Sequence, residues 1–294
     1  MSLSAILFAG MNFLAHLASG HVAWSLVAGS RASIGVLVAV AVARVRGVSF
    51  IPRSTPTMWL RSVFGTLSLG CTFYAVGSRA IALGDAVTLV NLSPVLLALM
   101  APIVLHEHAG RRVAMALPLS VAGVILILKP SLLFGGGAAH AGLAFPASVA
   151  VFASFFSAFA MMMLRRVGRR ESPEAIAMHF GAVAAVSMLL LSIPRLAVPS
   201  GIDIVTILGA GMCGGFAQLA MTRAYSLEYA ARVSPFGYIS VLASTVMGGL
   251  ALHEWPDRLA LLGMVLIVSG GLVVSIAAMR DAGRRKPNLD RLKA

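Results

Sequence analysis

Charged side chains are scarce in this sequence, and acidic ones are the scarcest. Only 11% of the 294 residues are charged and 10 are Asp or Glu, whereas 59% are hydrophobic. A soluble globular domain has about 25% charged residues, which it needs to cover a surface that faces water. The composition therefore excludes a water-soluble domain and indicates a protein whose solvent is lipid.

Cysteines and cofactor-binding motifs are also few. Cys71 and Cys213 both lie inside apolar runs, where a thiol usually packs as a small apolar group. No G-x-x-x-x-G-K-[ST] run is present to cradle the phosphates of ATP, and the His-Glu pairs at 106–107 and 253–254 lack the H-E-x-x-H spacing of a helical zinc site. We therefore expect no cofactor and no metal.

The net charge of +13 at first suggests a nucleic-acid partner. Six of the 23 basic residues, however, lie close together at the end of the chain, from Arg280 to Lys293. A basic tail after an apolar segment is typical of a cytoplasmic anchor attracted to anionic lipid. We expect a lipid bilayer as the partner of these charges, and no nucleic acid.

Ten apolar runs divide the chain. Their lengths suit a bilayer core about 30 Å thick, and backbone groups in lipid must pair within their own segment, so each run predicts a transmembrane helix. The runs cover residues 3–19, 22–43, 58–78, 85–105, 113–128, 144–164, 175–193, 205–224, 231–252 and 259–279.

The positions of the 23 basic residues support the count of ten. If the N-terminus is cytoplasmic, most of them, Arg61 included, fall in the connections assigned to the inside and in the tail, as the positive-inside rule requires. Removing one internal helix would reverse every later connection and destroy this asymmetry. The pattern predicts ten helices with both termini in the cytoplasm.

An internal repeat relates the two halves of the chain. The stretch SRAIALGDAVTLVNLSPVLLALMAPIVLHE resembles TRAYSLEYAARVSPFGYISVLASTVMGGLALHE half a chain later. Because each half holds an odd number of helices, the two must be inserted with opposite orientations, which is typical of transporters. We therefore predict an all-α integral membrane protein of ten transmembrane helices, built as two inverted five-helix repeats at 1–137 and 138–280, with a cytoplasmic tail at 281–294.

These motifs also resemble a known family. The runs RSVFGT and YAVGSRAIALGDAVTLVNLSPV in the first half, and QLAMTRAYSLEYAARVSPFGYISV in the second, are similar to those of the drug/metabolite transporter superfamily, EamA type. The resemblance implies a permease of the bacterial inner membrane, often a homodimer, with a central cavity for a small-molecule substrate. The AY…SPFGY form is similar to a branch that contains carriers of riboflavin, S-adenosylmethionine and amino acids.

The function that follows is secondary transport, without ATP, of a small organic metabolite by alternating access. An amino acid, a nucleoside-like solute or a vitamin-like solute fits this expectation. The alternative is a membrane-embedded enzyme that acts on a lipid or isoprenoid intermediate. Such an enzyme usually shows a cluster of acid, base or metal-binding groups at one interface, and the sequence shows none.

Candidate substrate-binding residues are the polar side chains of the apolar runs. Arg31, near the middle of its run, would cost about 2.5–3.5 kcal/mol there unless a carboxylate, carbonyl groups or an anionic solute compensated it. His179 lies close to the position that the internal repeat relates to Arg31. The others follow helical spacing, which marks faces turned away from lipid. They are Asn12, Tyr74, Asn91, Gln218, Thr222, Tyr225 and Tyr238.

Each of these polar residues has a simpler interpretation as a contact between helices, and Arg31 as a packing residue bonded to carbonyl groups. Pro94 and Pro235 each remove a backbone hydrogen bond, so we predict a hinge or an exposed carbonyl at both. No acidic residue lies at the middle of a run. Proton coupling would therefore need His16, His179 or Asp85, and exchange or facilitated diffusion fits equally well.

Overall fold

A computed structural model describes residues 1–52, 55–97, 100, 111–128, 138–168, 171–195, 199–227 and 233–291. Regular structure in these ranges is helical, with no strand. The α-helices are α1 Ser2–Ala18, α2 Trp24–Val45, α3 Pro56–Gly77, α4 Leu83–Val90, α6 Arg111–Leu128, α8 Ala138–Val167, α9 Pro173–Ser192, α10 Gly201–Leu227, α12 Ile239–Leu252 and α13 Arg258–Arg291, with two 3-10 helices, η1 Ile193–Arg195 and η2 Ser234–Tyr238.

The prediction of an all-helical chain is confirmed, because every predicted apolar run contains helix. By length and hydropathy, four described segments are able to cross a membrane alone: Trp24–Val45, Gly142–Leu164, Pro173–Arg195 and Gly201–Tyr225. The remaining runs appear as shorter apolar helices, such as Phe236–Leu252, or carry polar residues, as α3 does.

Two helix starts show how local sequence sets the boundaries. The Thr55 hydroxyl accepts a hydrogen bond from the Met58 amide at 3.2 Å, and Pro56 opens α3. The Ser172 hydroxyl accepts from the Ala175 amide at 3.1 Å, and Pro173 opens α9. A hydroxyl cap satisfies an amide that has no partner in the helix, and proline at the first position loses no bond there.

Residue size is distributed as expected for a protein packed in lipid. Alanine supplies many of the buried positions, whereas large apolar side chains such as Leu37, Phe145, Leu190 and Leu242 are more than half exposed. Small residues allow helices to approach closely, and an outward apolar surface is stable only against lipid. The chain is therefore a membrane protein.

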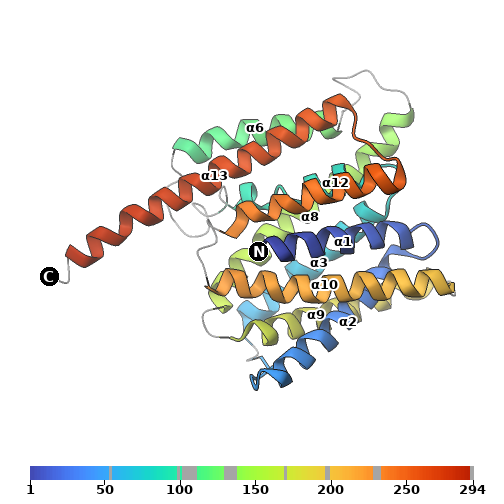
Figure 1. Ribbon diagram of the computed structural model, residues 1–294, viewed down its shortest axis with the longest axis horizontal. Coiled ribbons are helices and arrows are strands. Elements are labelled where there is room, and N and C mark those ends of the chain that lie inside the picture. The colour runs from blue at the N-terminus through green and yellow to red at the C-terminus, as the bar shows by residue number, and fades with distance from the viewer. Residues whose placement is uncertain are drawn as a thin grey trace.

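The helices of the two halves interlock in pairs. α2 packs on α9, α3 on α8, α1 on α10, α4 on α12 and α6 on α13, so that each pair joins a helix from the first half to one from the second (Figure 1). The backbones of α6 and α13 approach each other closely where they cross, because a Cβ at Gly123 would stand 2.6 Å from the Gly263 carbonyl oxygen. This pair lies along one edge of the bundle, and α2 with α9 lies along the opposite edge (Figure 1).

Candidate functional site: a buried arginine between three helices

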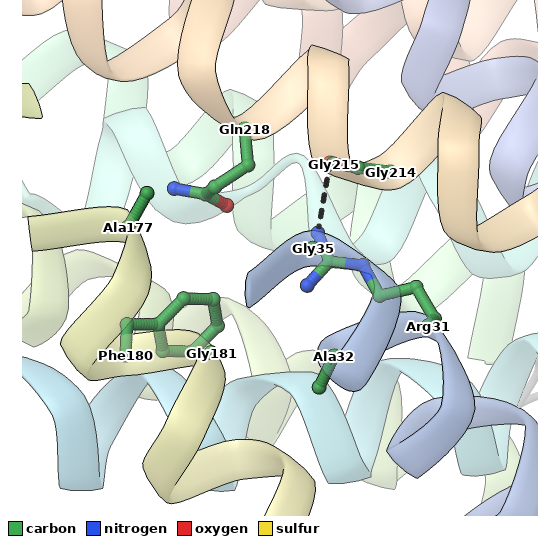
Figure 2. Close-up of a pocket in the computed structure, with 9 residues that line it drawn as sticks. All are labelled: Arg31, Ala32, Gly35, Ala177, Phe180, Gly181, Gly214, Gly215 and Gln218. Carbon is green, nitrogen blue, oxygen red and sulfur yellow. Dashed lines mark hydrogen bonds between the residues drawn. The ribbon is translucent and has the colours of Figure 1, made fainter. Parts of the chain in front are cut away.

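Arg31 lies in the interior of the bundle. α2 carries it toward α10, and its side chain is 3% exposed. Its Nε lies 3.3 Å from the Met11 sulfur, and its Nη2 donates to the Gly214 carbonyl oxygen at 3.4 Å (Figure 2). A thioether is a weak acceptor, and 3.4 Å is long for a hydrogen bond. The positive charge of Arg31 is therefore poorly compensated by the residues that the structure describes.

A glycine makes room for this side chain. A Cβ at Gly214 would stand 2.6 Å from the Arg31 Nε and 2.7 Å from the Met11 sulfur. The glycine-rich stretch of α10 thus allows α2 to lie close to it, as expected for small residues at helix contacts in a membrane.

A small cavity opens beside the guanidinium. Its lining comes from α2, α9 and α10, and consists of Arg31, Ala32, Gly35, Ala177, Phe180, Gly181, Gly214, Gly215 and Gln218 (Figure 2). The volume that the centre of a water molecule is able to occupy in this cavity is about 10 Å³. That is enough for about one water molecule and far too little for an organic solute. In this conformation the described residues therefore leave no room for a solute beside Arg31.

Gln218 and Thr222 provide the polar face of α10 at this level. The Gln218 Nε2 donates to the Thr222 hydroxyl at 3.3 Å, and that hydroxyl donates to the Gln218 carbonyl oxygen at 2.8 Å. Both side chains are less than a tenth exposed. Of the residues predicted to bind substrate, the structure brings Arg31 and Gln218 to one cavity and holds Thr222 next to them.

A second buried arginine was missed in the sequence. Arg61 of α3 is 4% exposed, although its nearness to the start of an apolar run had assigned it to a cytoplasmic connection. Its guanidinium carbon lies 4.7 Å from the centre of the Phe180 ring, on a cavity-lining side chain. Its Nε and Nη1 have no hydrogen-bond partner among the described residues, and its charge repels that of Arg31. Two cations thus share the interior of the bundle.

His179 is turned away from the Arg31 cavity. Its Nδ1 lies 2.7 Å from the Ser62 hydroxyl, and its ring packs edge-on against Trp59, with 4.8 Å between the centroids. Both partners belong to α3. His179 thus joins α9 to α3, and its neighbour Phe180 faces the cavity instead.

The predicted aromatic residues fall into two groups, because Tyr225 lies close enough to Tyr238 for an electrostatic interaction, whereas Tyr74 packs elsewhere. Tyr74 packs edge-on between Trp24 and Phe145, at centroid distances of 5.7 and 5.8 Å. Tyr238 is 4% exposed, and its hydroxyl has no hydrogen-bond partner among the described residues. Tyr225 is half-buried near the end of α10. The three rings form no common stacking site in this conformation.

The two predicted asparagines lie at separate places. Asn12 of α1 is 7% exposed, and its Oδ1 has no partner in the described part of the chain. Asn91 donates to the Val87 carbonyl oxygen at 2.8 Å and faces the Ser240 hydroxyl at 3.4 Å. Asn91 therefore links the end of α4 to the start of α12.

Helix geometry is interrupted near both predicted hinges. α4 ends at Val90, just where Pro94 lacks the amide that would bond to its carbonyl, and helix resumes at residue 93. Pro235 lies within the 3-10 helix η2, directly before α12. The side chain of Pro235 lies outside the described residues, and so does the whole of Glu107. Both prolines coincide with breaks, and a hinge motion at them stays a prediction.

Comparison with known proteins relates the chain to transporters. The model of the EamA-like transporter family matches residues 144–276. The pseudopaline exporter of Pseudomonas aeruginosa is 30% identical over 274 residues, which cover 93% of each chain. A riboflavin transporter of Rhizobium johnstonii is 26% identical over 75% of this chain and 70% of its own length. A solved crystal structure with 23% identity superposes with a TM-score of 0.68 and covers 95% of this chain and 96% of its own, which shows a shared fold.

Proposed function

Because the chain belongs to the EamA-like transporter family, a family of secondary small-molecule transporters within the drug/metabolite transporter superfamily, we propose that it carries a small organic solute with an anionic group, and that Arg31 binds this group. The solute occupies the space between α2, α9 and α10 when these helices separate. A carboxylate or a phosphate matches the planar, charged donors of a guanidinium.

The observation that carries this proposal is the poor compensation of the Arg31 charge by the described residues. Its hydrogen-bond contacts among them are a sulfur at 3.3 Å and a carbonyl oxygen at 3.4 Å. Buried charges are normally paired, because an unpaired charge away from water is unfavourable by several kcal/mol. An anion from outside the chain would supply the missing partner, and the second buried cation, Arg61, would strengthen its attraction.

The size of the cavity supports alternating access. Space for about one water molecule leaves no room for the solute, so the bound state requires the helices around Arg31 to move apart. Figure 2 shows Arg31 and Gln218 on different helices, so that a rocking motion of one helix against the other would open the gap between them.

The packing supports an inverted repeat of residues 1–137 and 138–280. If the first helices, α1, α2, α3, α4 and α6, correspond in order to α8, α9, α10, α12 and α13, exchanging the halves leaves the observed pairs unchanged. α2 on α9, α4 on α12 and α6 on α13 pair each helix with its counterpart, and α3 on α8 becomes α10 on α1. A twofold axis in the membrane plane produces such a pattern. Both termini then lie in the cytoplasm of a bacterial cell, with the tail at 281–294.

The remaining predicted substrate contacts belong to this proposal as residues that reach the solute after the helices separate. Asn12, Tyr74, Asn91, His179, Tyr225 and Tyr238 do not border the closed cavity. A homodimer, as the family resemblance implies, also stays a prediction. Relatives are named as transporters or exporters, which favours transport over a membrane-embedded enzyme.

Thermal stabilisation of the purified protein tests the proposal. The relatives suggest a first panel of pseudopaline and flavins, extended by amino acids and nucleotides. Riboflavin and its 5′-phosphate form a matched pair, as do an amino acid and its amide, since each differs in one anionic group. We expect every compound that stabilises the protein to carry a carboxylate or phosphate group, and its counterpart without that group to have no effect.

Two arginine variants complete the test. Arg31→Gln should abolish both the stabilisation and the flux of the identified compound into proteoliposomes. Arg44→Gln removes a charge from an exposed position of the same helix and should leave both unchanged. Equal stabilisation by neutral compounds, or full flux in Arg31→Gln, would remove the proposed anion site.

A further inference from the structure

His16 has an acceptor at each ring nitrogen. α1 places the ring at 0% exposure, with Nδ1 against the Val76 carbonyl oxygen at the end of α3 and Nε2 3.0 Å from the Glu254 Oε1. A carbonyl oxygen only accepts, so Nδ1 carries a hydrogen and donates it to Val76. A neutral imidazole has a single N–H, which leaves Nε2 as a bare acceptor in front of a carboxyl group.

One additional proton is therefore required between His16 and Glu254. It lies either on Nε2, which makes His16 an imidazolium beside a carboxylate, or on Oε1, which makes Glu254 a neutral acid that donates to Nε2. In both arrangements the pair holds one proton more than a neutral histidine beside an ionised glutamate. Without it, two lone pairs would face each other in the protein interior, which is unfavourable.

Glu254 is held in place by the chain around it. α12 ends with His253 in the left-handed conformation, at φ 59°, and the Glu254 amide donates to the Gly248 carbonyl oxygen. This turn directs the carboxyl group toward α1 and α4, where its Oε2 accepts from the Leu83 amide at 3.2 Å. The Glu254 side chain is 24% exposed, so water reaches the pair from this side.

The contact joins the two halves of the chain at one end of the bundle. His16, Val76 and Leu83 belong to the first half, and Glu254 follows α12 of the second. This end, where α1 and α3 finish and α4 starts, lies toward the right in Figure 1. If the halves rock apart at this end, Glu254 must leave His16 and Leu83.

Further charged or titratable groups lie at this end in the described residues, among them His253, Asp257 and Arg258 around Glu254. Arg79 approaches the same Oε1 of Glu254, at 3.9 Å, from the connection between α3 and α4. Asp85 lies in the first turn of α4, and on α10 Asp203 pairs with the exposed His21 at 3.2 Å. Arg79 thus brings a positive charge to the Glu254 carboxyl group.

We propose that the His16–Glu254 pair is a proton-binding site that closes this end of the carrier, so that opening it for solute is coupled to release of one proton to water. The inference rests on the proposed carrier function. The proton enters from the aqueous side through Glu254 and is shared by Nε2 and Oε1 while the end is closed. It leaves to water by the same route when the halves separate, and no other bond is made or broken.

Distances between spin labels test this without any solute. Labels at Ala80→Cys and Arg258→Cys, both exposed, report on the two halves at this end, in a chain with Cys71→Ala and Cys213→Ala. In lipid nanodiscs near pH 5 we expect one short distance. As the pH rises, the ratio of long to short distances should increase by up to tenfold per pH unit, the limit for one linked proton.

Two variants separate proton binding from simple support of the fold. In Glu254→Gln, the amide donates to Nε2 and its oxygen accepts from Leu83, so the short distance should persist at every pH. His16→Leu removes the contact and should show the long distance at every pH. A wild-type distance that is the same from pH 5 to 9, or a Glu254→Gln profile equal to that of the wild type, overturns the proposal.

Nuclear magnetic resonance tests the protonation of His16 and Glu254 directly in the wild-type protein, so it is useful if Glu254→Gln or His16→Leu fails to fold. In protein labelled with ¹⁵N-histidine and ¹³C-glutamate, the His16 signals are assigned by their loss in His16→Gln. A bare Nε2 beside an ionised Glu254 between pH 5 and 7 overturns the proposal. Neither measurement uses solute, so pH-independent distances in a protein whose Arg31-dependent flux is intact would refute proton coupling and leave the carrier function standing.

Discussion

Replacing Arg31 by Met should stabilise the protein without solute while it abolishes transport. An arginine at the middle of a membrane helix costs about 2.5–3.5 kcal/mol on insertion scales. The Met11 sulfur is a weak acceptor and the bond to Gly214 is long, at 3.4 Å, so we expect the two contacts to return about 1–2 kcal/mol, less than well-formed bonds to a charged group. The remaining penalty of about 0.5–2.5 kcal/mol disappears in the variant.

Methionine suits the position because its unbranched side chain fills the space that the Arg31 side chain occupies beside Met11, without a charge. Reversible unfolding in mixed detergent micelles, followed by tryptophan fluorescence, measures the free energy. Arg44→Met is the matched control, since Arg44 is exposed on the same helix and its guanidinium lies over Phe50 at 5.9 Å. We expect the control to change stability by less than about 0.5 kcal/mol.

A loss of stability would refute this reasoning. If Arg31→Met unfolds more easily by over about 1 kcal/mol while Arg44→Met does not, Arg31 holds α1, α2 and α10 together and its charge is already compensated. The packing interpretation of Arg31 would then be correct, and the anion site would have to lie elsewhere. A gain in stability with transport retained would leave the energetics intact and remove the role in binding.

Three further predictions follow from single contacts. Gly214→Ala places a Cβ 2.6 Å from the Arg31 Nε, so it should lower the free energy of unfolding by about 1–3 kcal/mol and abolish stabilisation by ligand. The control Gly142→Ala, whose Cβ meets nothing within 4 Å, should raise the free energy of unfolding by about 0.5–1 kcal/mol in the same assay. Tyr238→Phe removes a buried hydroxyl without a described partner and should be neutral or stabilising by up to about 1 kcal/mol, so a clear loss would reveal a hidden hydrogen bond. Arg46→Gln leaves the Glu174 carboxylate, which is 3% exposed, without its cation, and should lower the free energy of unfolding by about 3 kcal/mol. Glu174→Gln should cost less, because the Arg46 side chain is 37% exposed and regains water. Equal losses in the last pair would mean that solvent reaches Glu174.

The helices were predictable from the sequence because the physics of a membrane is local. Each apolar run must form its own backbone hydrogen bonds, so length and hydropathy alone locate it. The break before Pro94 follows in the same way, since the missing amide acts on the carbonyl of Val90 in the preceding turn.

Side-chain direction was much less predictable. Consecutive helix residues are rotated by about 100°, so a small change in the orientation of a helix exchanges the residue that faces a cavity. His179 and Phe180 illustrate this, because polarity favoured the histidine, whereas the phenylalanine lines the cavity and the histidine packs on Trp59. Arg61 was missed for a related reason, since a basic residue near a helix start is usually topogenic, and only the tertiary packing shows that Phe180 and Gly65 enclose it.

Contacts between distant segments explain the remaining difference. Glu254 orders the turn after α12, since its amide donates to the Gly248 carbonyl oxygen and its carboxylate accepts from the Leu83 amide. The partner on the other oxygen, His16, is 238 positions away, and no local rule connects them. Such a pairing depends on how the halves interlock, which is a property of the whole fold.

The contacts that join the halves at the two ends of the bundle differ in chemistry, as the proposed alternating access would require. Arg46 and Glu174 join the halves where α2 ends and α9 begins, and His16 and Glu254 join them at the opposite end. Both contacts are formed here, and the cavity between them holds about one water molecule, as expected for an occluded state. A guanidinium keeps its charge at any physiological pH, so a proton cannot switch that contact off through Arg46, whereas the histidine contact requires a proton that water can remove. If a single signal weakened both pairs, the two ends would open together and the solute would leak. Release of a proton at one end alone would allow that end to open while the arginine pair keeps the other end closed.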